Sequence, residues 1–456
     1  MLCAKSNRIS IAALAACVVF AGTYPVLAQE PPTSISGGGP PTVGDGIPFN
    51  SWILFPTLDL FSQNSDNYFL NPGGKISGWG FGVSPKMTAE WSDGIHTTTI
   101  YGNVEGRVYP TENEINALDE EATFTQNYAP LRDLNFTLMT DFTHKTIASS
   151  LTSSIPSTIQ STATTTLPNG NTVLPNGTIV SPTGQFVGQA NPALVVNGIS
   201  VVNPYDQYTA TATAQKIFGD GIVTLNTSWT RADYSQMSSE DFSAKTFNED
   251  FSFWLGPVFY LYSDGVYSIR SSAPPNPDAT IYRIIGGIGT RQFGLFRLSG
   301  YFGHQGSDEA GTAGGNVYGG VLTYYPLPNW TLSANVDDTT NISSQTSPSS
   351  LALVIPSTSP LQIPLSSSTE TTSSIVHSTY QITPQWATTE SFGYTRVQFL
   401  GSPFWENAWI ADATLRYDIW RDLSLTWEYQ FTSIVSNQPN TNADRSLVIM
   451  TASYRF

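Results

Sequence analysis

The last twelve residues, 445–456 (RSLVIMTASYRF), constrain the fold of this chain more than any other stretch. Counted back in twos from Phe456, the residues Tyr454 and Met450 fall with it on one apolar face of a strand, and polar residues fall on the other. A strand with one apolar face that stops on an aromatic residue needs a neighbour to pair with and an apolar surrounding. A soluble sandwich or a membrane barrel would supply both.

The same two-residue period recurs from Ser51 onward. Each instance alone is weak evidence, but seven of them carry an apolar set on one face and a polar, often charged, set on the other. They cover 54–60, 81–91, 100–108, 134–142, 330–337, 411–419 and 423–432. The repetition predicts an all-β fold.

Connections between these strands alternate in length. Short turn-forming links are expected near 92–94, 132–133, 219–221, 263–265, 291–292, 328–329, 387–388 and 421–422. Longer links are expected at 62–74, 111–119, 147–204, 235–246, 272–279, 304–314, 343–370, 401–404 and 437–443. Short periplasmic turns opposite long external loops are typical of outer-membrane barrels. The pattern predicts a transmembrane antiparallel up-and-down β-barrel over 51–456, with about eighteen strands and both ends on the short-turn side.

Two segments leave a count of sixteen strands open. Gly256-Pro257 interrupts one predicted strand, since a proline inside a ladder indicates a bulge or kink. The segment 390–399 alternates poorly, with Arg396 on the face that also carries Phe392 and Tyr394.

Composition agrees with a barrel in the outer membrane. Charged residues make up 12% of the chain, against about 25% in ordinary soluble domains. Beyond the N-terminal leader no apolar run approaches the roughly 20 residues of a membrane-spanning helix. Aromatic residues, also 12%, are expected to form girdles at the two lipid interfaces and not to fill a core.

Charge narrows the choice of partners. The net charge of −16 makes the chain a poor partner for nucleic acid. If the excess carboxylates line a pore, they favour cations or neutral solutes over anions.

Residues 1–28 read as a cleaved signal peptide, with a basic start, a short apolar core and small residues before the cut. Both cysteines, Cys3 and Cys17, lie in it, so cleavage after Ala28 leaves no thiol in the mature chain. The stretch ending in Cys17 also resembles a lipobox, which leaves lipidation of Cys17 as an alternative.

The Pro/Gly-rich segment 29–50 is expected to be flexible, either as a tail or as a periplasmic tether for an export partner. The link 147–204 carries three similar seven-residue units, at 167–173, 174–180 and 181–187, each a turn followed by an extended arm. This link is either an enlarged surface loop or a plug that enters the lumen. The loop 343–370 would cap the same mouth.

The candidate functional residues are charged side chains that strand parity turns toward the interior. These pore-lining candidates are Asp59, Lys86, Glu90, Glu105, Arg107, Asp141, Arg297, Asp337, Asp412, Arg416, Asp418 and Glu428, joined by Arg455. Opposed charges across a lumen would orient polar solutes. Internal salt bridges that satisfy buried charge are an equal alternative.

Motifs for catalysis, cofactors or metals are not evident. The sequence has no phosphate-binding glycine loop and no HExxH motif, and its four histidines are scattered without ligand spacing. Pairing of His144 with Asp141, or of His304 with Asp308, is the only arrangement that would suggest a rim-located hydrolase. We expect a protein that is not an enzyme and needs no cofactor.

Two resemblances to known proteins add to this interpretation. The closing strand resembles those of bacterial outer-membrane barrels, in which a terminal Phe is commonly read by the assembly machinery, and this implies such a signal at Tyr454 and Phe456. The stretches 54–58 (LFPTL) and 65–68 (SDNY) resemble the start of the beta-barrel porin 2 family of Gram-negative outer membranes. The chain departs from that family by its long segment 147–204 and by Ser65 where an acidic residue is frequent. The family likeness implies a role in exopolysaccharide export.

Three functions follow as hypotheses for a barrel embedded in outer-membrane lipid. The first is a porin-like channel for passive passage of polar solutes. The second is a conduit for polysaccharide that works with periplasmic export partners. The third is a surface adhesin or receptor that uses the loops 147–204 and 343–370.

Overall fold

The computed structural model describes residues 46–68, 75–111, 116–149, 165–166, 172–173, 178–180, 186–189, 200–235, 241–274, 278–308, 314–341, 369–399, 403, 405–437 and 442–456. The predicted signal peptide, the Cys17 lipidation site and most of the segment 29–50 lie outside these residues. The last residues of that segment form a short strand, β1 (Ile47–Phe49), which pairs with the start of β2.

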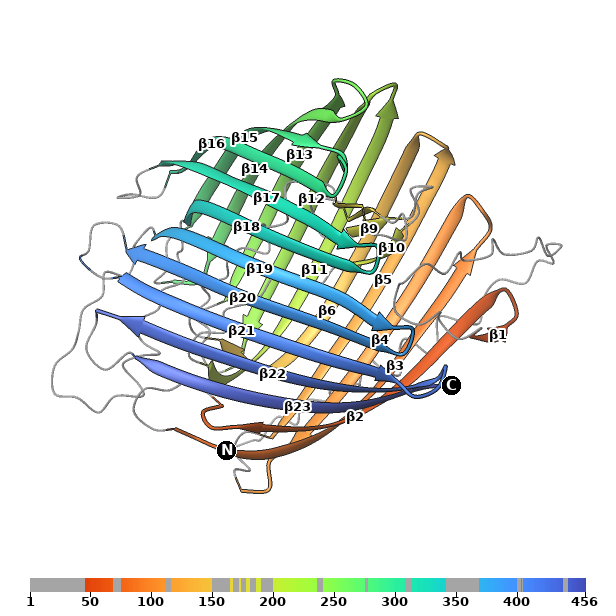
Figure 1. Cartoon of the computed structure of the whole chain (residues 1–456), viewed down its shortest axis with the longest axis vertical. Coiled ribbons are helices and arrows are strands. Elements are labelled where there is room, and N and C mark those ends of the chain that lie inside the picture. Colours follow the sequence, from red (N-terminus) through yellow and green to blue (C-terminus); the bar gives the residue numbers. More distant parts are fainter. Residues whose placement is uncertain are drawn as a thin grey trace, which may run out of the picture. The chain divides into compact units, whose positions relative to one another are not determined.

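Eighteen long strands form one antiparallel sheet that closes on itself (Figure 1). They are β2 (Trp52–Ser65), β3 (Gly78–Ser92), β4 (His96–Val108), β5 (Ala117–Leu131), β6 (Leu134–Ser149), β11 (Ser200–Phe218), β12 (Gly221–Tyr234), β13 (Phe242–Trp254), β14 (Phe259–Ser272), β15 (Ala279–Thr290), β16 (Phe296–Ser307), β17 (Gly315–Leu327), β18 (Trp330–Asn341), β19 (Thr369–Thr383), β20 (Trp386–Phe399), β21 (Trp405–Asp418), β22 (Leu423–Ser436) and β23 (Ala443–Arg455). Each pairs with its neighbour in sequence. The pairing of β2 with β23, from Thr57–Arg455 to Ser65–Leu447, closes the ring. The predicted antiparallel barrel is confirmed, with eighteen strands and not sixteen.

Loop lengths alternate around the ring as predicted. One end carries eight turns of two to five residues, and the other carries connections of five to fifty residues. Both β2 and β23 have their outer chain ends on the short-turn side. Among the described residues no helix is long and apolar enough to cross a membrane.

Two of the predicted turns were misplaced. Ser263-Asp264-Gly265 is wrong as a turn, because it lies inside β14, and the chain reverses at 255–258 instead. There Gly256 adopts a φ of 149°, which favours glycine, and Pro257 has no N–H to give to a ladder. The turn expected at 387–388 occurs at 384–385, where Pro384 likewise stops the pairing before Trp386.

The irregular segment 390–399 is part of a regular strand, β20. Arg396 lies on its outer face near the long-loop end, and its guanidinium carbon lies 6.0 Å from the ring centroid of Trp405. A cation–π contact at the rim therefore accommodates the charge that breaks the alternation.

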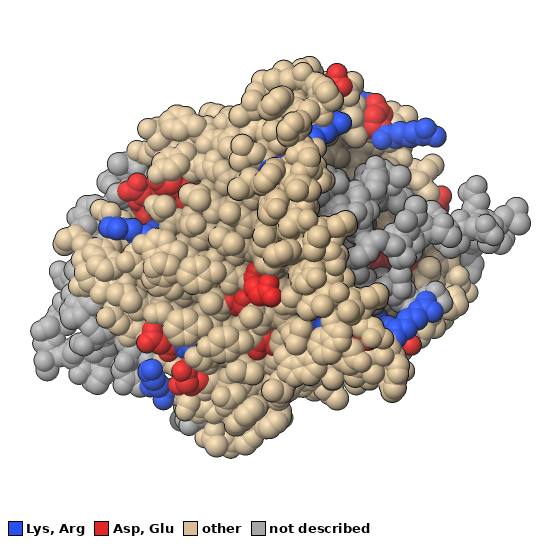
Figure 2. Space-filling model, in the orientation of Figure 1, with Lys and Arg blue, Asp and Glu red and all other residues tan. Residues whose placement is uncertain are grey.

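The two faces of the sheet differ as strand parity predicts. On the outer face of β2 and β3, Leu60 and Phe81 each expose 52% of their surface. On the opposite face Asp59 and Ser84 expose 8% and 2%. Figure 2 shows that uncharged side chains cover most of the visible surface and that charges gather in a few clusters.

Outward aromatic rings on neighbouring or next-but-one strands lie close together at the short-turn end. The pairs include Trp52–Trp91, Phe218–Phe251, Phe296–Tyr324, Trp330–Tyr380 and Trp386–Tyr417, with ring centroids 4.3–6.5 Å apart. These rings lie on β2, β3, β11, β13 and β16–β21, so they form an aromatic belt at this end. Such belts are typical of a membrane–water interface.

The expectation that no aromatic residues fill a core was wrong for one wall. On the inner face of β14, Tyr260 and Tyr262 are 3% and 7% exposed and pack with Ile285 and Val317. Their rings lie over the glycines opposite them on β15, Gly289 and Gly287, where a Cβ would overlap the rings. Because glycine has no side chain there, each tyrosine lies against the wall.

The segment 147–204 contains a small antiparallel sheet. Its strands are β7 (Thr165–Thr166), β8 (Thr172–Val173), β9 (Thr178–Val180) and β10 (Phe186–Gln189), in the order β10-β9-β8-β7. The last three coincide with the ends of the three seven-residue units, as expected from a repeated turn and arm. The rest of the segment, and nearly all of 343–370, lies outside the described residues, so the plug and cap remain predictions.

Candidate functional site: the charged inner face of the barrel

Oppositely charged side chains are paired at several places on the inner face. Near the long-loop ends of β4–β6, Arg107 binds both Glu105 (Nε to Oε1, 3.2 Å) and Asp119, and Lys145 Nζ lies 3.6 Å from the same Asp119. The backbone N–H of Thr146 also donates to Asp119, at 2.9 Å. This cluster fixes two cations and two carboxylates on adjacent strands.

A second pair lies on β14 and β15, beside the tyrosine wall. Arg283 Nη2 donates to Asp264 Oδ1 at 2.9 Å, and both side chains are largely buried. Asp250 is paired in register with Asp264 on the neighbouring strand β13. The carboxylates of Asp250 and Asp264 therefore both lie near the guanidinium group of Arg283.

A polar cavity of about 230 Å³ lies at the short-turn end of the inner face, where β21–β23 meet β2 and β3. Lys86 Nζ binds Asp59 Oδ2 at 2.6 Å on one side, and Arg416 Nε binds Asp418 Oδ1 at 2.8 Å on the other. Arg455 also lines the cavity, and it is the residue opposite Thr57 in the pairing that closes the barrel.

The predicted inner-face residues divide by their contacts. Asp59, Lys86, Glu105, Arg107, Arg416 and Asp418 form ion pairs. Asp141 instead accepts hydrogen bonds from Thr123 and Thr143 at 2.9 and 3.0 Å. Within the described part of the chain, no ion pair is formed by Glu90, Arg297, Asp337, Asp412 or Glu428.

Sequence reasoning missed several charged residues of the inner face, namely Asp119, Lys145, Asp250, Asp264 and Arg283. Asp264 was hidden by the misplaced turn at 263–265, and Asp119 by a loop boundary drawn too far into β5. Correct strand boundaries with the same parity rule would have included them.

Neither predicted catalytic pair is assembled. His144 lies on the outer face, where its Nδ1 is 2.6 Å from Asp206 Oδ1, whereas Asp141 lies on the inner face. The carboxylate of Asp308 accepts a hydrogen bond from the backbone N–H of Thr280 at 2.7 Å, and the ring centroid of His304 lies 6.3 Å from that of Tyr282. Among the described residues no three His, Cys, Asp or Glu side chains are grouped to hold a metal ion.

At the long-loop rim two tyrosines pack against each other. The ring centroids of Tyr68 and Tyr109 are 4.8 Å apart, and Tyr109 Oη accepts a hydrogen bond from Gln63. Burial, reinforced by Tyr109, raises the pKa of the Tyr68 phenol, and burial also raises the pKa of Tyr109. Both rings are therefore neutral hydrogen-bonding groups at physiological pH.

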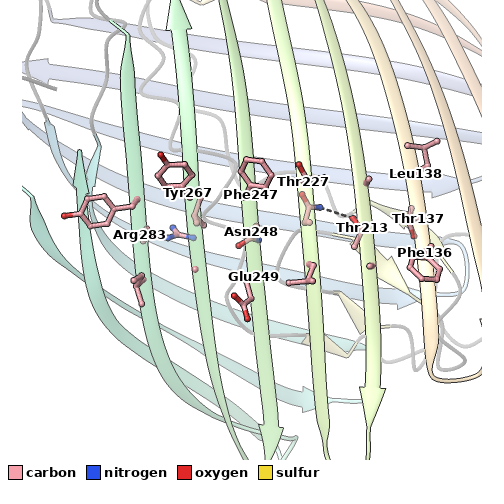
Figure 3. Close-up of a pocket in the computed structure, with 18 of the residues that line it drawn as sticks. Phe136, Thr137, Leu138, Thr213, Thr227, Phe247, Asn248, Glu249, Tyr267 and Arg283 are labelled. Carbon is pink, nitrogen blue, oxygen red and sulfur yellow. Dashed lines mark hydrogen bonds between the residues drawn. The ribbon is translucent and has the colours of Figure 1, made fainter. Parts of the chain in front are cut away.

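A large concavity lies on the outer face, across β5, β6 and β11–β15 (Figure 3). Its volume is about 870 Å³, and its outward side chains are mostly apolar, among them Leu138, Phe247 and Tyr267. Glu249 is the exception: it is exposed at the middle of β13, between Leu225 of β12 and Gly265 of β14.

No protein-family model and no curated protein matches this chain. It is similar to solved structures only at low sequence identity and at TM-scores below 0.5. Pseudomonas aeruginosa OpdQ has 11% sequence identity to this chain and a TM-score of 0.46. The match covers 89% of this chain and 97% of the OpdQ chain. The siderophore receptor PirA from Acinetobacter baumannii has 5% sequence identity and a TM-score of 0.47. The match covers 88% of this chain and 80% of the PirA chain. Likeness at this level carries no argument, and the fold assignment rests on the strand pairing described above.

Proposed function

We propose that the protein is an outer-membrane channel through which polar solutes pass passively along the barrel lumen. The observation that carries this proposal is the closed sheet with apolar side chains on its outer face and charged or hydroxyl side chains on its inner face. Such a wall can replace part of the hydration shell of a solute while the outer face contacts hydrocarbon.

The inner face would favour cations mildly over anions. Asp337, Asp412 and Glu428 add negative charge without an ion-pair partner in the described residues, whereas most inner cations are already paired. A charged wall concentrates counter-ions near the pore.

Tyr454 and Phe456 would form the signal read by the assembly machinery. Both rings are on the outer face, 43% and 61% exposed, and their centroids lie 4.8 Å apart. Their accessibility supports recognition during insertion. Export of polysaccharide and a receptor role remain predictions from the sequence.

Conductance of the purified full-length protein in planar lipid bilayers tests the channel. We expect stepwise conductance in KCl with a reversal potential on the cation-selective side. The triple variant Asp337→Asn, Asp412→Asn and Glu428→Gln should keep the steps and shift the reversal potential toward zero. A correctly folded barrel that gives no steps would refute the proposal.

A further inference from the structure

The polar cavity at the short-turn end is lined by several charged side chains. Two ion pairs, Lys86–Asp59 and Arg416–Asp418, stand on either side of it. Between them lie the small side chains Ser424 and Ser453, which follow Asp418 and precede Asp59 in one row of paired residues across β21, β22, β23 and β2. The hollow exists because the side chains between the ion pairs are short.

Two buried polar atoms of the cavity have no hydrogen-bond partner among the described residues: Nη1 of Arg455 and Oδ1 of Asp59. Asp59 itself is 92% buried, since only 8% of its surface is exposed. A buried donor or acceptor left unpaired costs about 1–3 kcal/mol. A donor and an acceptor that line one cavity are therefore suited to a ligand that supplies the complementary groups.

The charge and size of the cavity narrow the ligand class. Arg421 and Asp422, from the turn after β21, also line it, so its four cationic side chains exceed its three carboxylates by one. A volume of about 230 Å³ holds roughly eight water molecules, enough for a solute the size of a sugar acid. The excess guanidinium matches a carboxylate or phosphate, while Asp59 and the serine and threonine hydroxyls match hydroxyl groups.

We propose that this cavity is a solute-binding site for a small hydroxylated anion, with Arg455 holding the anionic group and Asp59 accepting a hydrogen bond from a hydroxyl group. The proposal deepens the channel function above and rests on it, since it places an anion-selective step within a mildly cation-selective lumen. Its position at one end of the barrel would make binding visible as an interruption of current.

The test measures block of KCl current by gluconate, glucose 6-phosphate and glucose, added on the side of the short turns. We expect gluconate or glucose 6-phosphate to block with saturation, and the comparison of the two tells carboxylate from phosphate. Glucose should not block. Arg455→Gln should weaken the block by about tenfold or more, because a charge-assisted hydrogen bond is lost. Lys86→Gln provides a second variant in case Arg455→Gln assembles poorly.

Arg445→Gln is the matched control. Arg445 lies on the same strand and the same face as Arg455, but at the long-loop end, where it donates to Gln430 at 2.8 Å. Its replacement should leave the block within twofold of the wild type. Equal weakening by Arg445→Gln and Arg455→Gln, or equal block by glucose, would overturn the site.

Calorimetry of gluconate and glucose 6-phosphate binding to the detergent-solubilised barrel separates this inference from the channel proposal. Saturable binding that Arg455→Gln weakens would support the site even if bilayers showed no conductance. Normal conductance without binding of either anion would refute the site and leave the channel intact.

Discussion

The side-chain amide of Asn67 donates a 3.0 Å hydrogen bond to the backbone carbonyl of Asp444, which joins the exit of the first barrel strand to the entry of the last. Beside it, the carboxylate of Asp66 accepts the backbone N–H of Ser446 at 2.7 Å, and the Asp66 N–H donates to the Ser446 carbonyl at 3.2 Å. The Asp-Asn pair that suggested a family resemblance thus fastens the seam between β2 and β23 at the long-loop end.

Replacing Asn67 with alanine should loosen this seam. Asn67 is fully buried, and its loss removes the side-chain hydrogen bond to Asp444 from the seam, at a cost of about 0.5–1.5 kcal/mol. Urea unfolding of the barrel in liposomes, followed by tryptophan fluorescence, measures the change. Asn329→Ala is the control, because Asn329, in the exposed turn between β17 and β18, makes a similar bond to the Gln381 carbonyl of the neighbouring strand β19. An equal loss in both variants would contradict a special role for the seam.

Two adjacent glycines on β15 should differ sharply in tolerance to alanine. A Cβ at Gly287 would overlap the ring of Tyr262 and approach the carbonyl oxygen of Gly300 at 2.6 Å, whereas a Cβ at Gly286 meets nothing within 4 Å. Gly287→Ala should therefore lower the yield of heat-modifiable, folded barrel, and Gly286→Ala should match the wild type. Because backbone forms part of the obstruction, overpacking here costs about 1–3 kcal/mol or more. A normal yield for Gly287→Ala would show that the tyrosine wall can shift.

Glu249 should destabilise the barrel in a bilayer. It is an exposed carboxylate at mid-strand on the apolar outer face, and charges on the lipid face of a barrel cost up to about 2–4 kcal/mol at the midplane, less for acidic residues. Glu249→Leu should raise the free energy of unfolding in liposomes by about 1–2 kcal/mol. The inner-face variant Glu428→Leu should not. A loss of stability in Glu249→Leu would instead indicate that the carboxylate binds a partner in the membrane.

Lowering the pH should weaken the hydrogen bond that joins the start of β15 to the end of β16 at the long-loop rim. The backbone N–H of Thr280 donates to the Asp308 carboxylate, which lowers the pKa of Asp308 below its ordinary value. A carboxyl whose pKa is lower in the folded state stabilises the fold above its unfolded pKa, and loses that contribution as the pH falls through the folded pKa. Hydrogen exchange of the Thr280 amide, corrected for its intrinsic pH dependence, should accelerate below that pH. Asp308→Asn should remove the pH-dependent step, and its persistence would point to another group.

The sequence predicted the strands and the alternation of loop lengths because both depend on local signals: a period of two and turn-forming residues. It failed where a long-range contact decides the outcome. Asp264 and Gly265 read locally as a turn, yet Arg283 on the next strand holds Asp264 within the sheet. Likewise the sequence suggests Tyr262 of β14 as a member of an aromatic girdle, because nothing local shows that Gly287 stands opposite it on β15. The polar cavity could not be predicted, since it assembles residues from both ends of the chain across the closing pair.

The final residues of β23 alternate between two solvents: Tyr454 and Phe456 outward, Arg455 inward. Deleting or inserting one residue within this strand would exchange the two sets, turning a guanidinium toward hydrocarbon and aromatic rings into the cavity. The proposed assembly signal and the proposed solute site would then be lost together. We therefore expect this strand to tolerate point substitutions far better than changes of length. Any insertion or deletion here must keep the two-residue alternation of its side chains.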